Sequence, residues 1–440
     1  MGITIKWQIQ FRMKTIWIEG GRPVEGGITL GGNKNAALPM IVAAILTRDE
    51  VVLHNVPDIL DVRQMLKIAE ALGVTVRRET ETLTLCAKDL QETTLPPQLC
   101  RSIRTSLLFA GPLVARCGEA RLAPPGGDVI GRRRLDGHFY GLQKLGVKIE
   151  ATPYVFHFHR EKRLRGAEIF LDEASVTATE HLLLTAVLAQ GTTIIRNAAC
   201  EPHITQLAQL LNTMGAKISG IESNILVIEG VRSLHGAEMT IGSDHVEAAS
   251  FLSLCAVTSG QLELRGDIQP HHYWMTRRVF ERFGLHFTLR PNLITMKVHH
   301  PPRLVKDLGN AIPVIADGPW PQFPSDMMSC MIVVATQAKG TVLFFEKMFE
   351  SRLYFVDKLV AMGANAVVCD PHRVVISGGV RLHGVEMSSP DIRAGMAMVV
   401  AAACAKGTST IYNAEMIYRG YSNLIPKLNA LGVNAREIES

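Results

Sequence analysis

Two patterns of apolar positions alternate along the chain and predict a repeated unit of helices and strands. In one pattern apolar residues recur three or four positions apart, as in the stretch 62–72, so that a helix has one apolar face. In the other the segment is apolar nearly all round, which is typical of a helix buried on every side. Segments of this second kind lie at 36–46, 107–115, 182–188, 248–257, 327–336 and 394–405.

Each of these buried helices is followed by a turn and a short predicted strand. The strands are expected at 51–53, 120–122, 193–195, 262–264, 342–344 and 409–411. The surface helices end in an apolar residue and a glycine, where a helix C-cap favours positive φ. These glycines recur about every 70 residues, at Gly73, Gly146, Gly215, Gly284, Gly363 and Gly432. The repeat predicts six β/α units, split three and three into two similar domains.

Polar residues gather just before the buried helices. They are Asn33, Lys34, Asn35, Arg101, Arg104, Ser175, Thr177, Asp244, His245, Glu247, Ser325, Asp326, Asp391 and Arg393. Ordinary N-capping explains Ser325 or Asp391. It does not explain lysine and arginine at helix starts, where the helix dipole repels cations. If the helices run parallel, their N-termini form one surface that favours phosphate and carboxylate ligands.

The stretch 124–134 reads Pro-Pro-Gly-Gly-Asp-Val-Ile-Gly-Arg-Arg-Arg and predicts a surface loop. It carries one carboxylate, Asp128, and three consecutive arginines. Such a loop suits a lid that closes over an anionic substrate. The alternative is a solvated loop whose charges only keep the protein in solution.

Composition narrows the function classes. The 440 residues, 47% hydrophobic and 20% charged, indicate a soluble globular protein of two or three domains. A net charge of +5 spread along the chain and an aromatic content of 6% favour small anionic ligands over nucleic acid. Eight scattered cysteines without a CxxC pair argue for a reducing compartment and against a disulfide or zinc framework.

Nothing in the sequence predicts a membrane partner. The apolar segment 396–405 is too short to cross a bilayer. The N-terminus lacks a signal-peptide pattern, and residues 1–12 are interpreted as an extension ahead of Met13, the alternative start. We therefore expect a cytoplasmic protein.

Five motifs make the chain recognisable: 32–39 (Gly-Asn-Lys-Asn-Ala-Ala-Leu-Pro), 111–116, 126–131, 323–327 and 419–421. From about Met13 onward the chain resembles the enolpyruvyl transferase family. The resemblance implies two inside-out α/β domains, each of three β/α repeats, joined by two crossovers. The expected boundaries are 13–33 with 242–440 for one domain and 34–241 for the other, which carries the lid loop 124–136.

The resemblance also implies a reaction. The 3′-hydroxyl of UDP-N-acetylglucosamine adds to C2 of phosphoenolpyruvate while C3 is protonated, and the tetrahedral intermediate then loses phosphate. This chemistry needs cations around a phosphate and a carboxylate, an acid for C3 and a base for the hydroxyl. No metal or cofactor is implied, and we expect a monomer or weak homo-oligomer.

The family pattern assigns roles residue by residue. Lys34 and Asn35 match the pair that holds phosphoenolpyruvate, and Asp326 matches the candidate base. Arginines, whose planar fork binds carboxylate and phosphate bidentately, match at Arg104, Arg133, Arg352, Arg393 and Arg419. Lys34, Asp128 and Asp326 are the expected catalytic residues. The substrate-binding set is completed by Arg101, Asp136, Ser175, Val176 and Met348.

Asp128 stands where most family members have cysteine. A carboxylic acid is able to deliver a proton as a thiol does, but it is a weak nucleophile toward the epoxide antibiotic fosfomycin, which alkylates the family cysteine. The sequence therefore predicts an enzyme that is insensitive to fosfomycin.

Other departures lie on the acceptor side, at Arg134, Glu173, Thr177, Met416 and Tyr418. They leave three hypotheses open. The first has UDP-N-acetylglucosamine as acceptor, and the second has another nucleotide or nucleotide sugar from a specialised pathway. The third is a paralogue that binds ligand without turnover, against which the retention of Lys34, Arg133, Asp326 and Arg419 argues.

Overall fold

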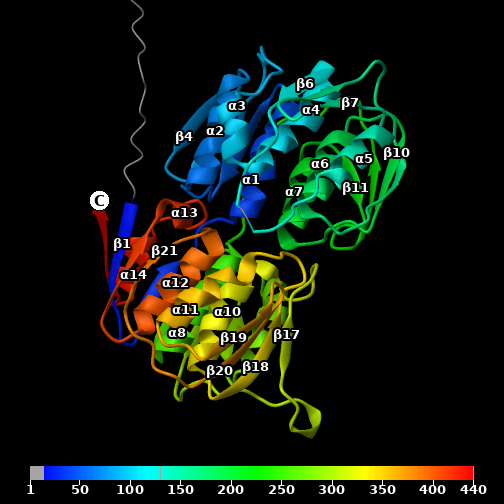
Figure 1. Cartoon of the computed structure of the whole chain (residues 1–440). Coiled ribbons are helices and arrows are strands. Elements are labelled where there is room, and N and C mark those ends of the chain that lie inside the picture. Colours follow the sequence, from blue (N-terminus) through cyan, green and yellow to red (C-terminus); the bar gives the residue numbers. More distant parts are fainter. Residues whose placement is uncertain (1–13, 129, 440) are drawn as a thin grey trace, which may run out of the picture.

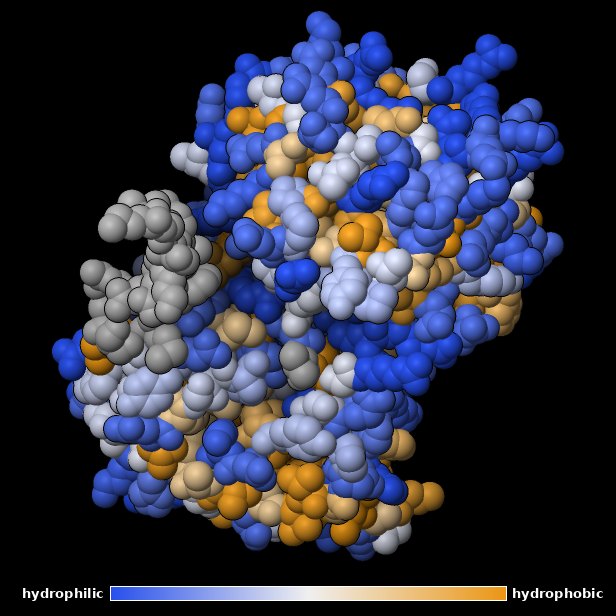
Figure 2. Space-filling model, turned by 45° about the horizontal axis from the view of Figure 1, so that its top comes forward, coloured by the Kyte–Doolittle hydropathy of each residue, from blue (hydrophilic) through white to orange (hydrophobic). Residues whose placement is uncertain are grey.

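The structure is a computed structural model and describes residues 14–128 and 130–439. The expected extension 1–12 lies outside these residues. Figure 1 shows two lobes, which we call the terminal lobe and the central lobe. The core of the terminal lobe draws on residues 16–30 and 246–435, and the core of the central lobe on 36–241. In Figure 2, hydrophilic side chains gather where the two lobes meet.

The central lobe has three sheets, in the strand orders β13-β3-β5-β4, β6-β8-β7 and β11-β12-β10-β9. Its strands are β3 (Glu50–His54), β4 (Thr75–Glu79), β5 (Thr82–Cys86), β6 (Glu119–Leu122), β7 (Lys148–Ala151), β8 (Phe156–His159), β9 (Glu168–Phe170), β10 (Thr192–Arg196), β11 (Lys217–Ser219), β12 (Ile225–Glu229) and β13 (Ala237–Thr240). Its helices are α1 (Lys34–Ala43), α2 (Leu60–Ala71), α3 (Pro97–Ser102), α4 (Ala110–Cys117), α5 (Asp136–Lys144), α6 (Val176–Ala186) and α7 (Pro202–Thr213).

The terminal lobe also has three sheets, in the orders β15-β16-β14-β2, β17-β18-β20-β19 and β21-β22-β1-β23. Its strands are β1 (Lys14–Glu19), β2 (Glu25–Thr29), β14 (Gln261–Arg265), β15 (Phe287–Arg290), β16 (Leu293–Lys297), β17 (Val314–Ala316), β18 (Gly340–Phe345), β19 (Ala366–Asp370), β20 (Arg373–Gly378), β21 (Glu386–Ser388), β22 (Thr408–Tyr412) and β23 (Asn434–Glu439). Its helices are α8 (His245–Thr258), α9 (Trp274–Glu281), α10 (Ser325–Gln337), α11 (Val356–Ala361), α12 (Ile392–Cys404), α13 (Glu415–Tyr418) and α14 (Leu424–Ala430).

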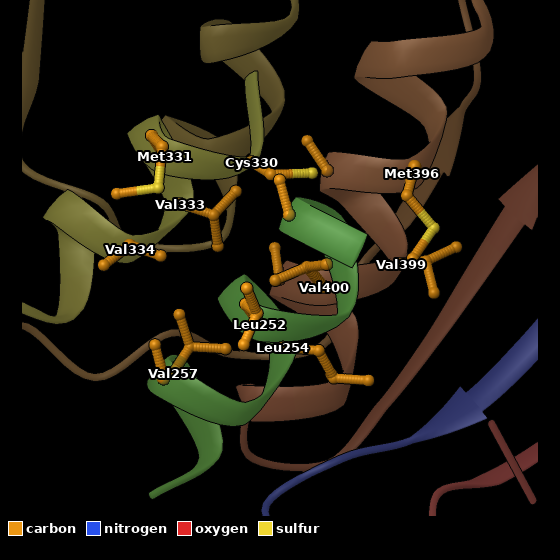
Figure 3. Packing of buried hydrophobic residues seen from close by; sticks show 14 of the residues in the cluster. Leu252, Leu254, Val257, Cys330, Met331, Val333, Val334, Met396, Val399 and Val400 are labelled. Atoms are coloured by element: carbon orange, nitrogen blue, oxygen red, sulfur yellow. The ribbon is translucent and has the colours of Figure 1, made fainter. Parts of the chain in front are cut away.

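The predicted buried helices form the inside of each lobe, and the sheets form the outside. In the terminal lobe α8, α10 and α12 pack against one another, as Figure 3 shows for Leu252, Met331 and Val400. These three side chains are fully buried. Each such burial is worth roughly 1.5–3 kcal/mol. The helices are apolar all round because they contact protein on every side, and the prediction of six β/α units is confirmed.

The glycines predicted to end the surface helices all have positive φ, from 67° at Gly284 to 102° at Gly363. One predicted helix differs in its start. The stretch 104–109 is a 3-10 helix, and α4 begins only at Ala110. Pro112 explains the difference, because proline is tolerated in the first turn of an α-helix, where its missing N–H is not needed.

The chain passes between the lobes twice, and the two crossings lie side by side. The Asn33 N–H donates to the Gly242 carbonyl at 2.9 Å, and the Asp244 N–H donates to the Gly31 carbonyl at 2.9 Å. A Cβ on Gly32 would lie 1.8 Å from the Asn55 carbonyl oxygen, so only glycine fits there. The strand before each crossing belongs to the lobe that the chain is leaving. β2 pairs with β14 in the terminal lobe, and β13 pairs with β3 in the central lobe.

The other sequence-based expectations concern cysteines and the membrane. All eight cysteines are free. Among the described residues, no helix has the length and apolar character that crossing a bilayer requires.

Candidate active site

A cavity of about 250 Å³ lies between the two lobes. It is lined by the first residues of five helices, α1, α6, α8, α10 and α12, and by the loop that contains Asp128. The N-terminal N–H groups of these helices add partial positive charge to the cavity. The predicted site residues that line it are Lys34, Asn35, Arg104, Asp128, Arg133, Val176, Asp326, Met348, Arg352, Arg393 and Arg419.

Six cations converge on this cavity, three from each lobe. The central lobe supplies Lys34, Arg104 and Arg133, and the terminal lobe supplies Arg352, Arg393 and Arg419. Burial lowers the pKa of Arg104 to about 10, helped by the neighbouring charge of Arg133. Cations held this close together repel one another unless anions lie between them, so the site is suited to a ligand with several negative charges.

Asp326 is the anion between two of the arginines. Its carboxylate accepts hydrogen bonds from Arg352 Nη2 at 3.0 Å and from Arg393 Nε at 3.1 Å, and Arg393 Nη2 lies 2.9 Å away. Burial alone would raise the pKa of Asp326, but Arg393, Arg352 and Lys34 lower it far below its usual range. Asp326 is therefore an ionised carboxylate, able to accept a proton.

Asp61, which the sequence does not mark as a site residue, is the anion between a second pair of cations, Lys34 and Arg419. Its oxygens lie 2.7 Å from Lys34 Nζ and 2.8 Å from Arg419 Nε. Burial would raise the pKa of Asp61, but Lys34 and Arg419 outweigh it and lower the pKa. In the sequence Asp61 is simply an acid in the first turn of α2, a position that the helix dipole favours in any helix.

The predicted loop 124–134 has no helix or strand among its described residues, and it reaches the terminal lobe. The Ser351 N–H donates to the Ile130 carbonyl at 3.0 Å, and the Arg132 N–H donates to Glu350 Oε2 at 3.1 Å. Asp128 accepts a hydrogen bond from Arg419 Nη1. The loop thus lies closed over the cavity, with its carboxylate turned toward a cation of the other lobe.

Three residues of the predicted binding set do not line the cavity. Arg101 is exposed. Asp136 is exposed and pairs with Arg134 Nε at 2.9 Å, so Arg134 faces Asp136 rather than Glu173. Ser175 caps α6 by accepting a hydrogen bond from the Ala178 N–H. Ordinary N-capping of a helix therefore explains the position of Ser175.

Other titratable residues of the cavity were not predicted as site residues. Glu180 is buried and Glu201 is partly buried. Desolvation raises the pKa of both, with the charge of Glu201 adding to the effect on Glu180. Burial lowers the pKa of His203 to about 3, so this ring is neutral at physiological pH. Glu180 lies in α6, His203 lies in α7, and Glu201 directly precedes α7. Both helices carry several other polar residues, so none of the three stands out in the sequence.

The fold and the cation-lined cavity define an enolpyruvyl transferase. Residues 18–428 match the family described as EPSP synthase (3-phosphoshikimate 1-carboxyvinyltransferase), and the chain belongs to this family.

Among curated proteins, the UDP-N-acetylglucosamine 1-carboxyvinyltransferase of Treponema denticola is 52% identical over 417 residues, which cover 94% of this chain and 97% of that protein. The protein of the same name from Borreliella burgdorferi is 48% identical over 428 residues, which cover 97% and 100%.

Solved structures agree on the architecture. The enolpyruvyl transferase NikO from Streptomyces tendae superposes with a TM-score of 0.86 at 23% identity, covering 97% of this chain and 99% of that one. EPSP synthase from Acinetobacter baumannii superposes with a TM-score of 0.75 at 18% identity, covering 97% and 100%. The expected fold, two inside-out α/β domains of three repeats each, is confirmed.

Proposed function

We propose that this protein transfers the enolpyruvyl group of phosphoenolpyruvate to the 3′-hydroxyl of UDP-N-acetylglucosamine and releases phosphate, the first committed step of peptidoglycan precursor synthesis. The observation that carries the proposal is the set of six cations around one cavity, with the ionised Asp326 between two of them. The names of the relatives, at 48–52% identity over nearly the whole chain, support the choice of acceptor.

Phosphoenolpyruvate brings a phosphate and a carboxylate, and the cations of the cavity match this charge. Lys34 and Asn35 bind it at the N-terminus of α1, while Arg352, Arg393 and Arg419 reach it from the terminal lobe. Arg104 and Arg133 complete the anionic site. Arginine forks suit both groups because they bind them bidentately.

The reaction then follows in two steps. The oxygen of the 3′-hydroxyl forms a bond to C2 while its proton passes to Asp326, the C2–C3 double bond breaks, and C3 takes a proton from an acid. In the second step the C2–O bond to phosphate breaks, the leaving phosphate takes the proton held by Asp326, and C3 returns a proton to the acid, which restores the double bond. Asp326 is the proposed base because its carboxylate is ionised before the reaction. Bound anions that draw Arg352 and Arg393 away would raise its lowered pKa and so strengthen it as a base.

Asp128 is the proposed acid for C3. In the unliganded protein its carboxylate accepts a hydrogen bond from Arg419. Bound phosphoenolpyruvate would compete for Arg419 with its own anionic groups. A carboxylate left beside those anions favours its protonated form, so substrate binding itself prepares the acid.

The same residue leads to the proposal that fosfomycin does not inactivate the enzyme. No cysteine occurs in the loop 124–136, and the carboxylate that stands there is a weak nucleophile toward an epoxide. A covalent fosfomycin adduct on the intact protein, seen by mass spectrometry, would overturn this.

The deciding experiment measures phosphate release from phosphoenolpyruvate, with and without UDP-N-acetylglucosamine and with and without fosfomycin. We expect release that requires the sugar nucleotide and is unaffected by the drug. Asp128→Asn should abolish release, and Asp128→Cys should keep it and make it sensitive to fosfomycin. Near-normal release by Asp128→Asn would remove Asp128 from the mechanism.

The second candidate is transfer to another nucleotide or nucleotide sugar, and the acceptor-side departures favour it. Thr177 lines the cavity, whereas Glu173 is exposed. Tight binding of phosphoenolpyruvate without release in the presence of UDP-N-acetylglucosamine would support this candidate. A paralogue without turnover would show thermal stabilisation by ligands but no phosphate release with any acceptor.

The setting of the enzyme is part of the proposal. We place it in the cytoplasm, as a monomer or weak homo-oligomer that works on small molecules, without a nucleic-acid or membrane partner. The domain boundaries that we propose, 13–33 with 242–440 and 34–241, are supported by the two separate hydrophobic cores.

A further inference from the structure

Two buried histidines connect the backbone of α4 to a hydroxyl in the cavity. The Gly111 N–H donates to His181 Nε2 at 2.9 Å, and Nδ1 of His181 lies 3.0 Å from Nδ1 of His138. Nε2 of His138 then lies 3.1 Å from the hydroxyl oxygen of Thr177. His138 and His181 are 2% and 0% exposed, and Thr177 lines the cavity. The three side chains form a continuous hydrogen-bonded chain.

The Gly111 N–H, the first donor, fixes the direction of every hydrogen bond in this series. A backbone N–H only donates, so Nε2 of His181 accepts and the proton of this ring lies on Nδ1. That proton is donated to Nδ1 of His138, which leaves the proton of His138 on Nε2, facing Thr177. Burial lowers the pKa of His181 to about 3, and burial, His181 and Arg104 lower the pKa of His138 well below its usual value. Both rings are therefore neutral, with one donor and one acceptor each.

The consequence falls on Thr177. Its oxygen accepts the hydrogen bond from His138, which leaves its own hydrogen available to an acceptor in the cavity. Thr177 is the second residue of α6, where free N–H groups and the helix dipole favour negative charge. Arg104, another residue of the cavity, lies close enough to influence His138. An anionic oxygen is the acceptor that suits the Thr177 hydroxyl, the free N–H groups at the start of α6 and Arg104.

We propose that Thr177 determines acceptor specificity: its hydroxyl, oriented by His138 and His181, donates a hydrogen bond to a phosphate oxygen of a nucleoside diphosphate. The inference rests on the proposed function only in taking a nucleotide sugar as the acceptor. Thr177 contacts the substrate, and the two histidines are positioning residues.

The first test compares Thr177→Val, which removes the hydroxyl at nearly constant shape, with Thr177→Ser, which keeps it. A hydrogen bond to a charged group corresponds to roughly a tenfold change in affinity or more. We expect Thr177→Val to raise KM for UDP-N-acetylglucosamine about tenfold, with kcat and KM for phosphoenolpyruvate within about twofold of the parent. Thr177→Ser should behave like the parent. An unchanged KM in Thr177→Val, or a change in KM for phosphoenolpyruvate instead, would contradict the proposal.

The second test addresses the histidines through a double-mutant cycle. His138→Leu should raise KM for the sugar nucleotide by a smaller factor than Thr177→Val, because the hydroxyl remains but is free to rotate. The double variant should be no worse than Thr177→Val alone, since His138 acts through Thr177. If the factors by which the two single substitutions raise KM simply multiply in the double variant, His138 has only a structural role. Thermal unfolding checks that each variant is folded, and Thr177→Val with Thr177→Ser decides the proposal if His138→Leu does not fold.

The third test does not depend on turnover. Nitrogen-15 NMR of the histidine rings in the unliganded protein should show His181 protonated on Nδ1 and His138 on Nε2 between about pH 6 and pH 8. Calorimetric titration of uridine diphosphate should give about tenfold weaker binding to Thr177→Val than to the parent. The reverse tautomers, a cationic ring, or a parent that does not bind uridine diphosphate would overturn the proposal. A parent that binds the diphosphate but releases no phosphate would instead contradict the proposed function.

Discussion

At the scale of single residues, two aspartates divide four cations of the cavity between them. Asp326 joins Arg352 and Arg393, which both belong to the terminal lobe. Asp61 joins Lys34 of the central lobe to Arg419 of the terminal lobe. An ion pair at such depth compensates the cost of burying its charges only while both partners are present.

Asp61→Asn should therefore destabilise the protein and impair the site. We expect a loss of about 3 kcal/mol in unfolding free energy, because Lys34 stays buried without its counter-charge and Arg419 keeps only that of Asp128. We also expect kcat/KM for phosphoenolpyruvate to fall at least about tenfold, since both cations lose their fixed positions. Urea unfolding and phosphate release measure the two effects.

Asp58→Asn is the matched control. Asp58 lies three residues earlier, is half exposed and pairs with Arg63 at 2.6 Å. An exposed pair of this kind contributes about 1 kcal/mol or less. If both variants lost the same stability and activity, Asp61 would have no special role in the site.

Glu346 predicts a pH effect on stability. Its oxygens accept hydrogen bonds from Ser325 Oγ and the Phe349 N–H, and burial, with Asp317 beside it, raises its pKa to about 8 from an ordinary 4.5. The folded state thus holds a proton that the unfolded state has released, so this residue lowers the unfolding free energy as pH rises from about 5 to 8.

Glu346→Gln mimics the protonated form and removes this titration. Relative to the parent, the variant should gain unfolding free energy between pH 5 and pH 8, which urea unfolding at the two values measures. Identical pH dependence in the two proteins would contradict the assignment.

The site residues that are predictable from the sequence are those that lie in an unusual pattern. Lys34 was found because a cation at a helix start violates the dipole rule. Asp61 follows that rule. His138 and His181 lie on α5 and α6, which carry several other polar residues, so neither histidine stands out in the sequence. Their roles depend on which distant residues they meet, and a single sequence does not contain that information.

At the scale of elements, the crossing of α5 and α6 depends on a glycine. A Cβ on Gly141 would lie 2.5 Å from a Leu182 methyl carbon, and Leu182 is fully buried. Gly141→Ala should cost about 1–3 kcal/mol of unfolding free energy through overpacking.

Gly137→Ala offers the control on the same helix. There the new Cβ would lie 3.5 Å from the Ala178 Cβ, an ordinary contact. Because alanine is the better helix former, this variant should be neutral or gain up to about 1 kcal/mol. Equal destabilisation of both variants in urea would show that helix propensity, rather than the contact with Leu182, decides the result.

The elements themselves were largely predictable. Six segments that are apolar all round became α1, α4, α6, α8, α10 and α12, because a segment with no polar face has no alternative to burial. The 3-10 helix before α4 was not predicted, since local hydrophobicity does not reveal where Pro112 allows an α-helix to begin.

At the scale of the whole molecule, closure of the loop depends on contacts between the lobes. Glu350 holds the Arg132 N–H from the terminal lobe. Glu350→Ala should open the loop more often and speed tryptic cleavage after Arg132, Arg133 or Arg134 by roughly threefold, the effect of one modest hydrogen bond. Mass spectrometry of timed digests measures this rate.

Asp357→Ala serves as control, because Asp357 is an exposed acid on α11, a few residues along the chain. It should leave the cleavage rate unchanged. If Glu350→Ala digested at the parent rate, the remaining contacts, such as that of Asp128 with Arg419, would be sufficient to hold the loop.

The position of β1 between β22 and β23 has a consequence for protein synthesis. Residues 36–241 leave the ribosome as one uninterrupted stretch and contain the whole core of the central lobe, which is thus able to fold early. β1 and β2 emerge first, yet their partners β22, β23 and β14 are made later, β22 and β23 near the end of translation. The nascent chain therefore carries two strands with unpaired edges through most of its synthesis. Such edges are open to chaperone binding, or to mispairing with another nascent chain on the same mRNA.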